Sequence, residues 1–199
     1  MTPGTGSNPQ GLGSLADERL GAVVAAMARR EARPAAGSAV AVTLSMSAAL
    51  LEKAASALNN GVPVDSAAQG RAEHLRTDAL VLADNDAATF RLVLAARGDA
   101  ARVRSALAQA AEPVLAMAEI GVTLARLADR LLDDVPPRLQ GEVRTAEHLA
   151  CAATHTAAEL VAIDLGELSK DPRAARAFEL AAEAAAHELT LAERPLRRR

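Results

Sequence analysis

The sequence has almost no aromatic side chains: two of its 199 residues are Phe, and there is no Trp or Tyr. Strands usually use aromatic and β-branched residues, so this shortage argues against a large β-sheet. The hydrophobic half of the chain is mainly Ala, Leu and Val. Ala is the residue that forms α-helices most readily, because it loses no side-chain entropy there. The composition therefore predicts an all-α protein.

Cysteine and excess positive charge are also scarce. A single cysteine, Cys151, excludes an intramolecular disulfide and is usual in a reducing compartment. The net charge is −3, so the chain as a whole does not attract nucleic acid. The one basic concentration, in residues 194–199, lacks aromatic residues to stack on bases. We expect no nucleic-acid partner and interpret 194–199 as a basic, solvated tail.

The chain also lacks a recognisable targeting segment. Residues 1–14 contain neither a basic residue nor an apolar run, so they do not resemble a secretory signal and are interpreted as a disordered leader. The longest apolar stretch, 35–51, contains Gly, Ser and Thr and is followed by Glu52 and Lys53. A membrane span needs about 18 strongly apolar residues, so we expect a buried core helix here. We predict a cytoplasmic protein with no membrane partner.

Helix signals organise residues 15–193 into one expected domain. Ser14 and Asp17 suggest a helix start, Asn59-Asn60-Gly61 a stop, and Pro113 a kink or short break within a helix. The expected helices span 15–30, 38–58, 65–97, 99–132, 141–168 and 172–192. Their short connections predict antiparallel neighbours in an up-and-down bundle of about six helices.

The turn between the first two expected helices, Arg33-Pro34-Ala35-Ala36-Gly37-Ser38, has two interpretations. Gly37 and Ser38 suit an ordinary turn with a helix cap. The turn could instead bind an anion or another ligand, because the first turn of a helix has backbone N–H groups without intrahelical partners.

Several acids are candidates for chemistry. Asp84 and Asp86 lie within a helix, where exposed charge is the usual explanation. Glu142 could simply complement the dipole at the start of the fifth helix. Asp164 lies near the far end of that helix, where negative charge opposes the dipole, among apolar neighbours. A partly buried acid in such a setting is a candidate site residue.

A polar stripe on the fifth helix contains Glu147, Cys151, His155 and Glu159 at four-residue steps, with His148 beside it. These are possible zinc ligands. Metal sites in helical bundles usually draw ligands from several helices, and no clear matching set occurs elsewhere. We therefore interpret the stripe as structural and predict no metal. A metal-binding bundle that uses His148, Cys151 and His155 remains the alternative.

Taken in order, several segments resemble the cyclodeaminase/cyclohydrolase family, which includes the C-terminal domain of formiminotransferase-cyclodeaminase and free-standing methenyltetrahydrofolate cyclohydrolase-like proteins. The matching segments are 33–41 with the family's glycine-rich turn, Asp86 with Phe90, 110–113, 141–143 and 160–165. The chain departs from the family pattern at several places. Ala replaces turn glycines at Ala35 and Ala36, Val62 replaces a lysine, Glu142 replaces an aspartate, and Leu160 and Asp164 replace asparagines.

The resemblance implies a folate-dependent cyclodeaminase or cyclohydrolase that acts on formimino- or methenyl-tetrahydrofolate by acid/base chemistry, with the folate as substrate and no cofactor. It implies Glu142 and Asp164 as catalytic groups. Substrate would bind at Pro34, Gly37, Ser38 and Asp86. It also implies a homodimer or higher homo-oligomer, a state that the nearly all-apolar helix 38–58 favours as well. The alternative is a catalytically silent member that serves as a homo-oligomeric interaction module.

Overall fold

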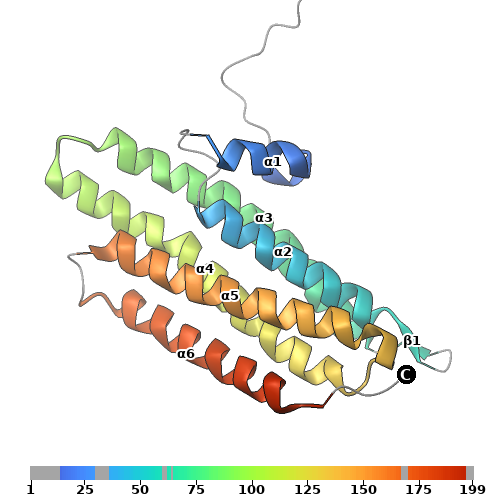
Figure 1. Cartoon of the computed structure of the whole chain (residues 1–199). Coiled ribbons are helices and arrows are strands. Elements are labelled where there is room, and N and C mark those ends of the chain that lie inside the picture. The colour runs from blue at the N-terminus through green and yellow to red at the C-terminus, as the bar shows by residue number, and fades with distance from the viewer. Residues whose placement is uncertain (1–13, 30–35, 60–61, 64, 167–169, 196–199) are drawn as a thin grey trace, which may run out of the picture.

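The computed structural model describes residues 14–29, 36–59, 62–63, 65–166 and 170–195. It confirms the all-α bundle (Figure 1). The six helices are α1 (Leu20–Met27), α2 (Ala36–Ala55), α3 (Ser66–Ala95), α4 (Ala100–Leu132), α5 (Gln140–Leu165) and α6 (Pro172–Glu193). Two 3₁₀ turns, η1 (Leu15–Asp17) and η2 (Pro137–Leu139), and two short strands, β1 (Leu58–Asn59) and β2 (Val62–Pro63), complete the described elements.

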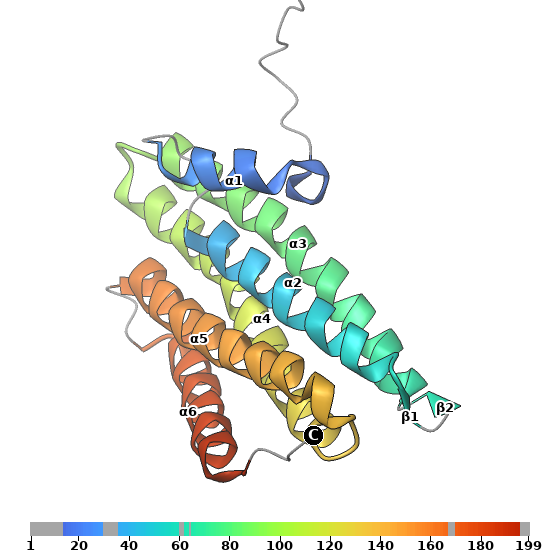
Figure 2. The ribbon, with the colours of Figure 1, turned by 45° about the vertical axis from the view of Figure 1, so that its right-hand side comes forward.

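The four long helices α2 to α5 form the centre of the molecule, with α2 packed on α3 and α5, and α4 packed on α3 and α5. Helix α6 covers the outer side of α4 and α5. The short α1 crosses the bundle near the start of α2 instead of running along it (Figures 1 and 2). Helix α5 therefore contacts α2, α4 and α6, and it is the helix with the most candidate site residues.

Several expected helix ends are confirmed. The side chains of Asp65, Asp99 and Asp171 cap α3, α4 and α6 by accepting hydrogen bonds from first-turn N–H groups. Gly98, with a φ of 98°, follows the end of α3. A residue without a Cβ adopts this conformation at little cost, which explains the helix stop.

The first expected helix, 15–30, is wrong as a single element. The backbone N–H of Asp17 donates to the carbonyl oxygen of Ser14, which closes a short 3₁₀ turn. Arg19 then has a ψ of 128°, which is extended, so an α-helix can begin only at Leu20. The side chain of Ser14 accepts from Ala16 rather than from Asp17. The expected capping pattern therefore forms a tight turn.

Two further boundaries differ from expectation. Helix α2 ends at Ala55, and Leu58, the expected last residue of this helix, belongs to strand β1, which pairs antiparallel with β2. Helix α4 continues through Pro113 without a break, so the expected interruption is absent there. The Pro113 side chain is buried, and packing against neighbouring helices offsets the backbone hydrogen bond that proline removes.

The core is made mostly of small aliphatic side chains, which allow close helix contacts. At Gly121 of α4, an added Cβ would lie 2.0 Å from Oγ1 of Thr154 on α5, so glycine is required for these helices to approach. By length and hydropathy alone α2 and α4 could cross a membrane, but 56% of each apolar window is buried inside the bundle. That burial is what core helices of a bundle show.

The basic tail is attached to the bundle at its first residue. Arg194 is partly buried, and its guanidinium lies 3.4 Å from Oδ1 of Asp129 and also contacts Asp133. Arg194 is therefore not part of a solvated tail as expected, because α4 supplies two carboxylates at the point where α6 ends. Residues 196–199 and the leader residues 1–13 lie outside the described part of the chain.

Candidate active site

The first part of the site is a contact between α2 and α3. Gly37 and Ser38 lie in the first turn of α2 and are both buried. An added Cβ on Gly37 would lie 2.4 Å from Oδ2 of Asp86, so the Asp86 carboxylate of α3 rests directly against this turn. The first turn of a helix favours a negative charge, since its N–H groups and dipole point toward it. Asp86 is thus partly buried against the first turn of α2 rather than solvated on an exposed face.

Asp164 brings the end of α5 to the same place. The pKa of Asp164 is raised to about 6. Burial is the larger cause, and the negative charge of Asp86 is the smaller one. Two neighbouring carboxylates in different settings tend to separate into one ionised group and one that holds its proton. Asp164 can therefore hold or release a proton closer to neutral pH than an ordinary aspartate does.

Ser38 adds a polar atom that lacks a partner. Its side chain is 1% exposed, and its Oγ has no hydrogen-bond partner among the described residues. A buried hydroxyl without a partner costs free energy unless something else satisfies it. A bound ligand with a hydrogen-bonding group would supply that partner.

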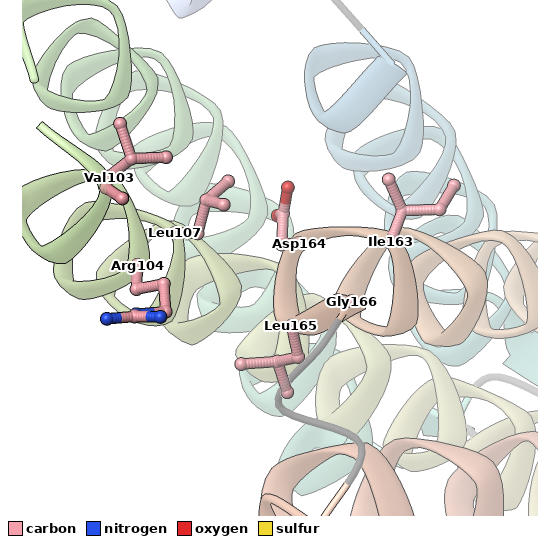
Figure 3. Close-up of a pocket in the computed structure, with 8 residues that line it drawn as sticks. Val103, Arg104, Leu107, Ile163, Asp164, Leu165 and Gly166 are labelled. Carbon is pink, nitrogen blue, oxygen red and sulfur yellow. The ribbon is translucent and has the colours of Figure 1, made fainter. Parts of the chain in front are cut away.

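A cavity of about 340 Å³ opens beside Asp164, between the start of α4 and the end of α5. Figure 3 shows the Asp164 carboxylate between Leu107 and Ile163, with Arg104 on α4 and its guanidinium directed away from Asp164. The lining is mainly apolar, with one acid and one cation. Its volume is at the low end of the range for small-molecule sites, and the polar groups are few, as such sites require.

Glu142 lies at the opposite end of α5. Its carboxylate accepts a hydrogen bond from Nζ of Lys53 at 2.8 Å, and this contact lowers the pKa of Glu142. Helix α5 is continuous between Glu142 and Asp164, so the two acids are separated by about 33 Å. They cannot act on one substrate within a single chain.

The structure therefore brings together Gly37, Ser38, Asp86 and Asp164, and leaves Glu142 apart. Pro34 lies outside the described residues. Sequence reasoning missed Arg104 and Lys53. Lys53 was recognised only as the end of an apolar stretch, although a lysine in the last turn of α2 could have indicated a replacement for the family lysine that is Val62 here.

The polar stripe of α5 does not form the ligand set considered from the sequence. His148 is exposed and lies 3.5 Å from Glu188. Cys151 is buried and donates to the carbonyl of Ala184, and burial raises the pKa of its thiol to about 12, so a thiolate is disfavoured. The acid of the stripe that is fully buried is Glu147, which belongs to a different cluster with α4 and α6.

Comparison with known proteins identifies the family. A sequence model described as formiminotransferase-cyclodeaminase matches residues 19–184. The chain belongs to this family. No curated protein matches the sequence. Among solved structures, the chain is similar to formiminotetrahydrofolate cyclodeaminase from Thermotoga maritima, with a TM-score of 0.74 and 21% identity over 88% of this chain and 92% of that one.

At this identity the structural similarity establishes a shared fold. The family match also confirms the resemblance drawn from the ordered segments, and it extends from α1 into α6. The cyclodeaminase-type bundle thus carries the cluster of Gly37, Ser38, Asp86 and Asp164 at one end.

Proposed function

We propose that the protein is a folate-dependent cyclodeaminase or cyclohydrolase that acts on formimino- or methenyl-tetrahydrofolate by acid/base chemistry. The observation that carries the proposal is the Asp164 carboxylate, which lines the cavity at the end of α5 and has its pKa raised by burial and by the charge of Asp86. Both reactions need proton transfers at a carbon that the pterin nitrogens already activate. A carboxyl group whose pKa is raised toward neutrality, as that of Asp164 is, can supply them.

In cyclodeamination, N10 of the folate attacks the formimino carbon, and the bond from that carbon to the leaving nitrogen breaks. The formimino group reacts as its protonated form, so the attack leaves an amino group on that carbon. Protonated Asp164 donates its proton to this amino group, which departs as ammonia, and the resulting carboxylate takes the proton that N10 gives up. In the hydrolytic reaction a carboxylate accepts a proton from the attacking water. In this proposal Arg104, which lines the cavity, binds a carboxylate of the folate glutamate, and the buried Oγ of Ser38 donates a hydrogen bond to the substrate.

The proposal includes a homodimer through α2. This helix lies on a face of the bundle, and its exposed positions recur at helical spacing: Ala36, Ala39, Met46, Ala49 and Lys53. Met46 is 50% exposed. An exposed helix face of this kind is best covered by a second copy of the same face across a two-fold axis.

A two-fold axis beside Met46 would bring Glu142 of one subunit to the site of the other. Met46 lies midway between Ala39 and Lys53, so antiparallel packing of α2 on its copy sets Ala39 opposite the partner subunit's Lys53. Ser38 adjoins Ala39, and Lys53 binds Glu142. Each site would then receive the partner subunit's Lys53 and Glu142, which one chain cannot provide. We place this dimer in the cytoplasm.

The test is binding and turnover with formimino- and methenyl-tetrahydrofolate, with Ser38→Ala as the matched variant. Turnover that Ser38→Ala weakens through KM supports the proposal. Absence of binding at millimolar ligand rejects it and leaves the silent interaction module. The substitutions Ala35→Gly, Ala36→Gly and Val62→Lys then distinguish an active enzyme from a silent module. Activity that appears only after these substitutions identifies a chain that has lost catalysis.

A further inference from the structure

The most deeply buried acid of the bundle is Glu147 in the first half of α5. Its side chain is 0% exposed, and neither carboxylate oxygen has a hydrogen-bond partner among the described residues. A carboxylate in such a position is strongly unfavourable unless something compensates it. It lies 17 positions, or about 26 Å, before Asp164 along α5, so the cavity at the other end cannot explain it.

Two further donor groups converge on Glu147 from the neighbouring helices. Asp129 of α4, Glu147 of α5 and His187 of α6 each offer one donor atom, and the three atoms lie within 4.8 Å of one another. Nδ1 of His187 already contacts Oδ2 of Asp129. The side chains of Asp129 and His187 are 23% and 18% exposed, so an ion can reach the cluster from solvent.

The surrounding charges leave Glu147 without a direct cationic partner among the described residues, although Asp129 has one in Arg194. The guanidinium of Arg144 donates to the backbone carbonyls of Leu191 and Arg194. Arg194 pairs with Asp129 and Asp133, and Glu183 lies 3.7 Å from Nε2 of His187. Both arginines lower the energy of an ionised Glu147 only from a distance. The carboxylate oxygens themselves remain unmatched.

We propose that Asp129, Glu147 and His187 bind one divalent transition-metal ion such as Zn²⁺. One imidazole and two carboxylates from three helices form a donor set that Zn²⁺ accepts, and the arrangement matches metal sites in other bundles. Zinc bonds to such donors measure about 2.0–2.2 Å, so donors of one tetrahedral ion lie roughly 3.4 Å apart. The distances between the three donor atoms would therefore have to shorten by little more than about 1 Å to hold such an ion.

The competing explanation is a metal-free contact in which Glu147 keeps its proton and shares it with Asp129. The two explanations differ in metal binding and in the effect of metal on unfolding. The experiment uses the full-length chain without an affinity tag, stripped with a chelator and desalted. Zn²⁺ is titrated by calorimetry, Co²⁺ by its visible absorption, and thermal unfolding is followed with and without Zn²⁺.

The ligand variants are Glu147→Gln, Asp129→Asn and His187→Ala. The matched controls are Glu188→Gln, which removes one negative charge beside the cluster, and His148→Ala, which removes the exposed histidine of α5. The proposal requires that the wild type and both control variants bind one Zn²⁺ per chain and show a Zn²⁺-dependent rise in Tm. The absorption spectrum of bound Co²⁺ should indicate a low coordination number. Each ligand variant should weaken binding at least about tenfold.

Helix content from circular dichroism is measured for every variant, and binding is compared only among folded ones. Glu147→Gln keeps the size of the side chain, so it tests the site even if His187→Ala fails to fold. Absence of stoichiometric Zn²⁺ binding to the wild type overturns the proposal in favour of the shared proton. Equal binding by wild type and all folded ligand variants overturns it as well.

Discussion

The Asp86 carboxylate lies against the α-carbon of Gly37 and fills the space that a side chain at position 37 would need. A Cβ added to Gly37 would lie 2.4 Å from Oδ2 of Asp86. This contact joins α3 to the first turn of α2, and the charge of Asp86 in turn raises the pKa of Asp164 on α5. Helices α2, α3 and α5 therefore meet at one place, where the charge of Asp86 acts on Asp164.

Gly37→Ala should displace Asp86 without unfolding the protein. The clash involves the movable end of a short side chain, and the gain in helix propensity of about 1 kcal/mol from Gly to Ala offsets part of its cost. We expect a change in the free energy of unfolding below about 1.5 kcal/mol, together with a large loss of turnover and a lower pKa of Asp164. Gly70→Ala in α3, where an added Cβ meets nothing within 4 Å, should stabilise the protein and leave turnover unchanged. Equal activity of the two variants would contradict a role for the Gly37–Asp86 contact.

Asp164→Asn should change how stability depends on pH. The pKa of Asp164 is about 6 in the folded state against 3.8 as a free group, so the folded state binds the proton more tightly. Its contribution to stability is fully present below about pH 4, is lost as pH rises to about 6, and amounts to at most about 3 kcal/mol. Denaturant unfolding of Asp164→Asn should lack this loss. Glu159→Gln, an exposed acid on the same helix, should retain it.

The same substitution tests the proposed catalysis. If Asp164 acts as the acid, kcat/KM should fall above about pH 6, and Asp164→Asn should lower kcat by about 10²–10⁴. A variant with wild-type kcat would remove Asp164 from the mechanism. It would leave the pH dependence of stability as a purely structural effect.

Glu142→Gln should separate catalysis from stability. The side chains of Lys53 and Glu142 are 59% and 25% exposed, and a pair of this kind contributes at most about 1 kcal/mol. The pair lowers the pKa of Glu142, so its contribution is present above about pH 4.5 and is lost as pH falls below that value. We expect a small loss of stability but a marked loss of kcat. Steady-state kinetics that show unchanged kcat would make Lys53–Glu142 a surface ion pair only.

Met46→Glu should dissociate the proposed dimer. The substitution sets two like charges beside the expected two-fold axis on α2, where an apolar contact is proposed. Light scattering should show a dimer for the wild type at micromolar concentration and a monomer for Met46→Glu. Leu189→Glu is the matched control, because Leu189 is 70% exposed on α6 and should not affect assembly. A monomeric wild type would refute the dimer and the shared site together.

The sequence by itself determined the helices and several of their ends. Abundant alanine and the near absence of aromatic residues specify helices, and the caps Asp65, Asp99 and Asp171 act on their own first turns. These signals are local, because a cap and a helix period depend on residues within one or two turns. Asp164 could be singled out in the same way, since a negative charge near the C-terminal end of a helix opposes the helix dipole.

Only the tertiary structure decided which residues from different helices meet. The contact of Asp86 with Gly37, the pairing of Lys53 with Glu142 and the convergence of Asp129, Glu147 and His187 all join positions on separate helices. Such contacts depend on how far each helix is shifted along its neighbour and rotated about its own axis. Packing of the whole set of small side chains fixes that shift and rotation, and no single segment encodes them.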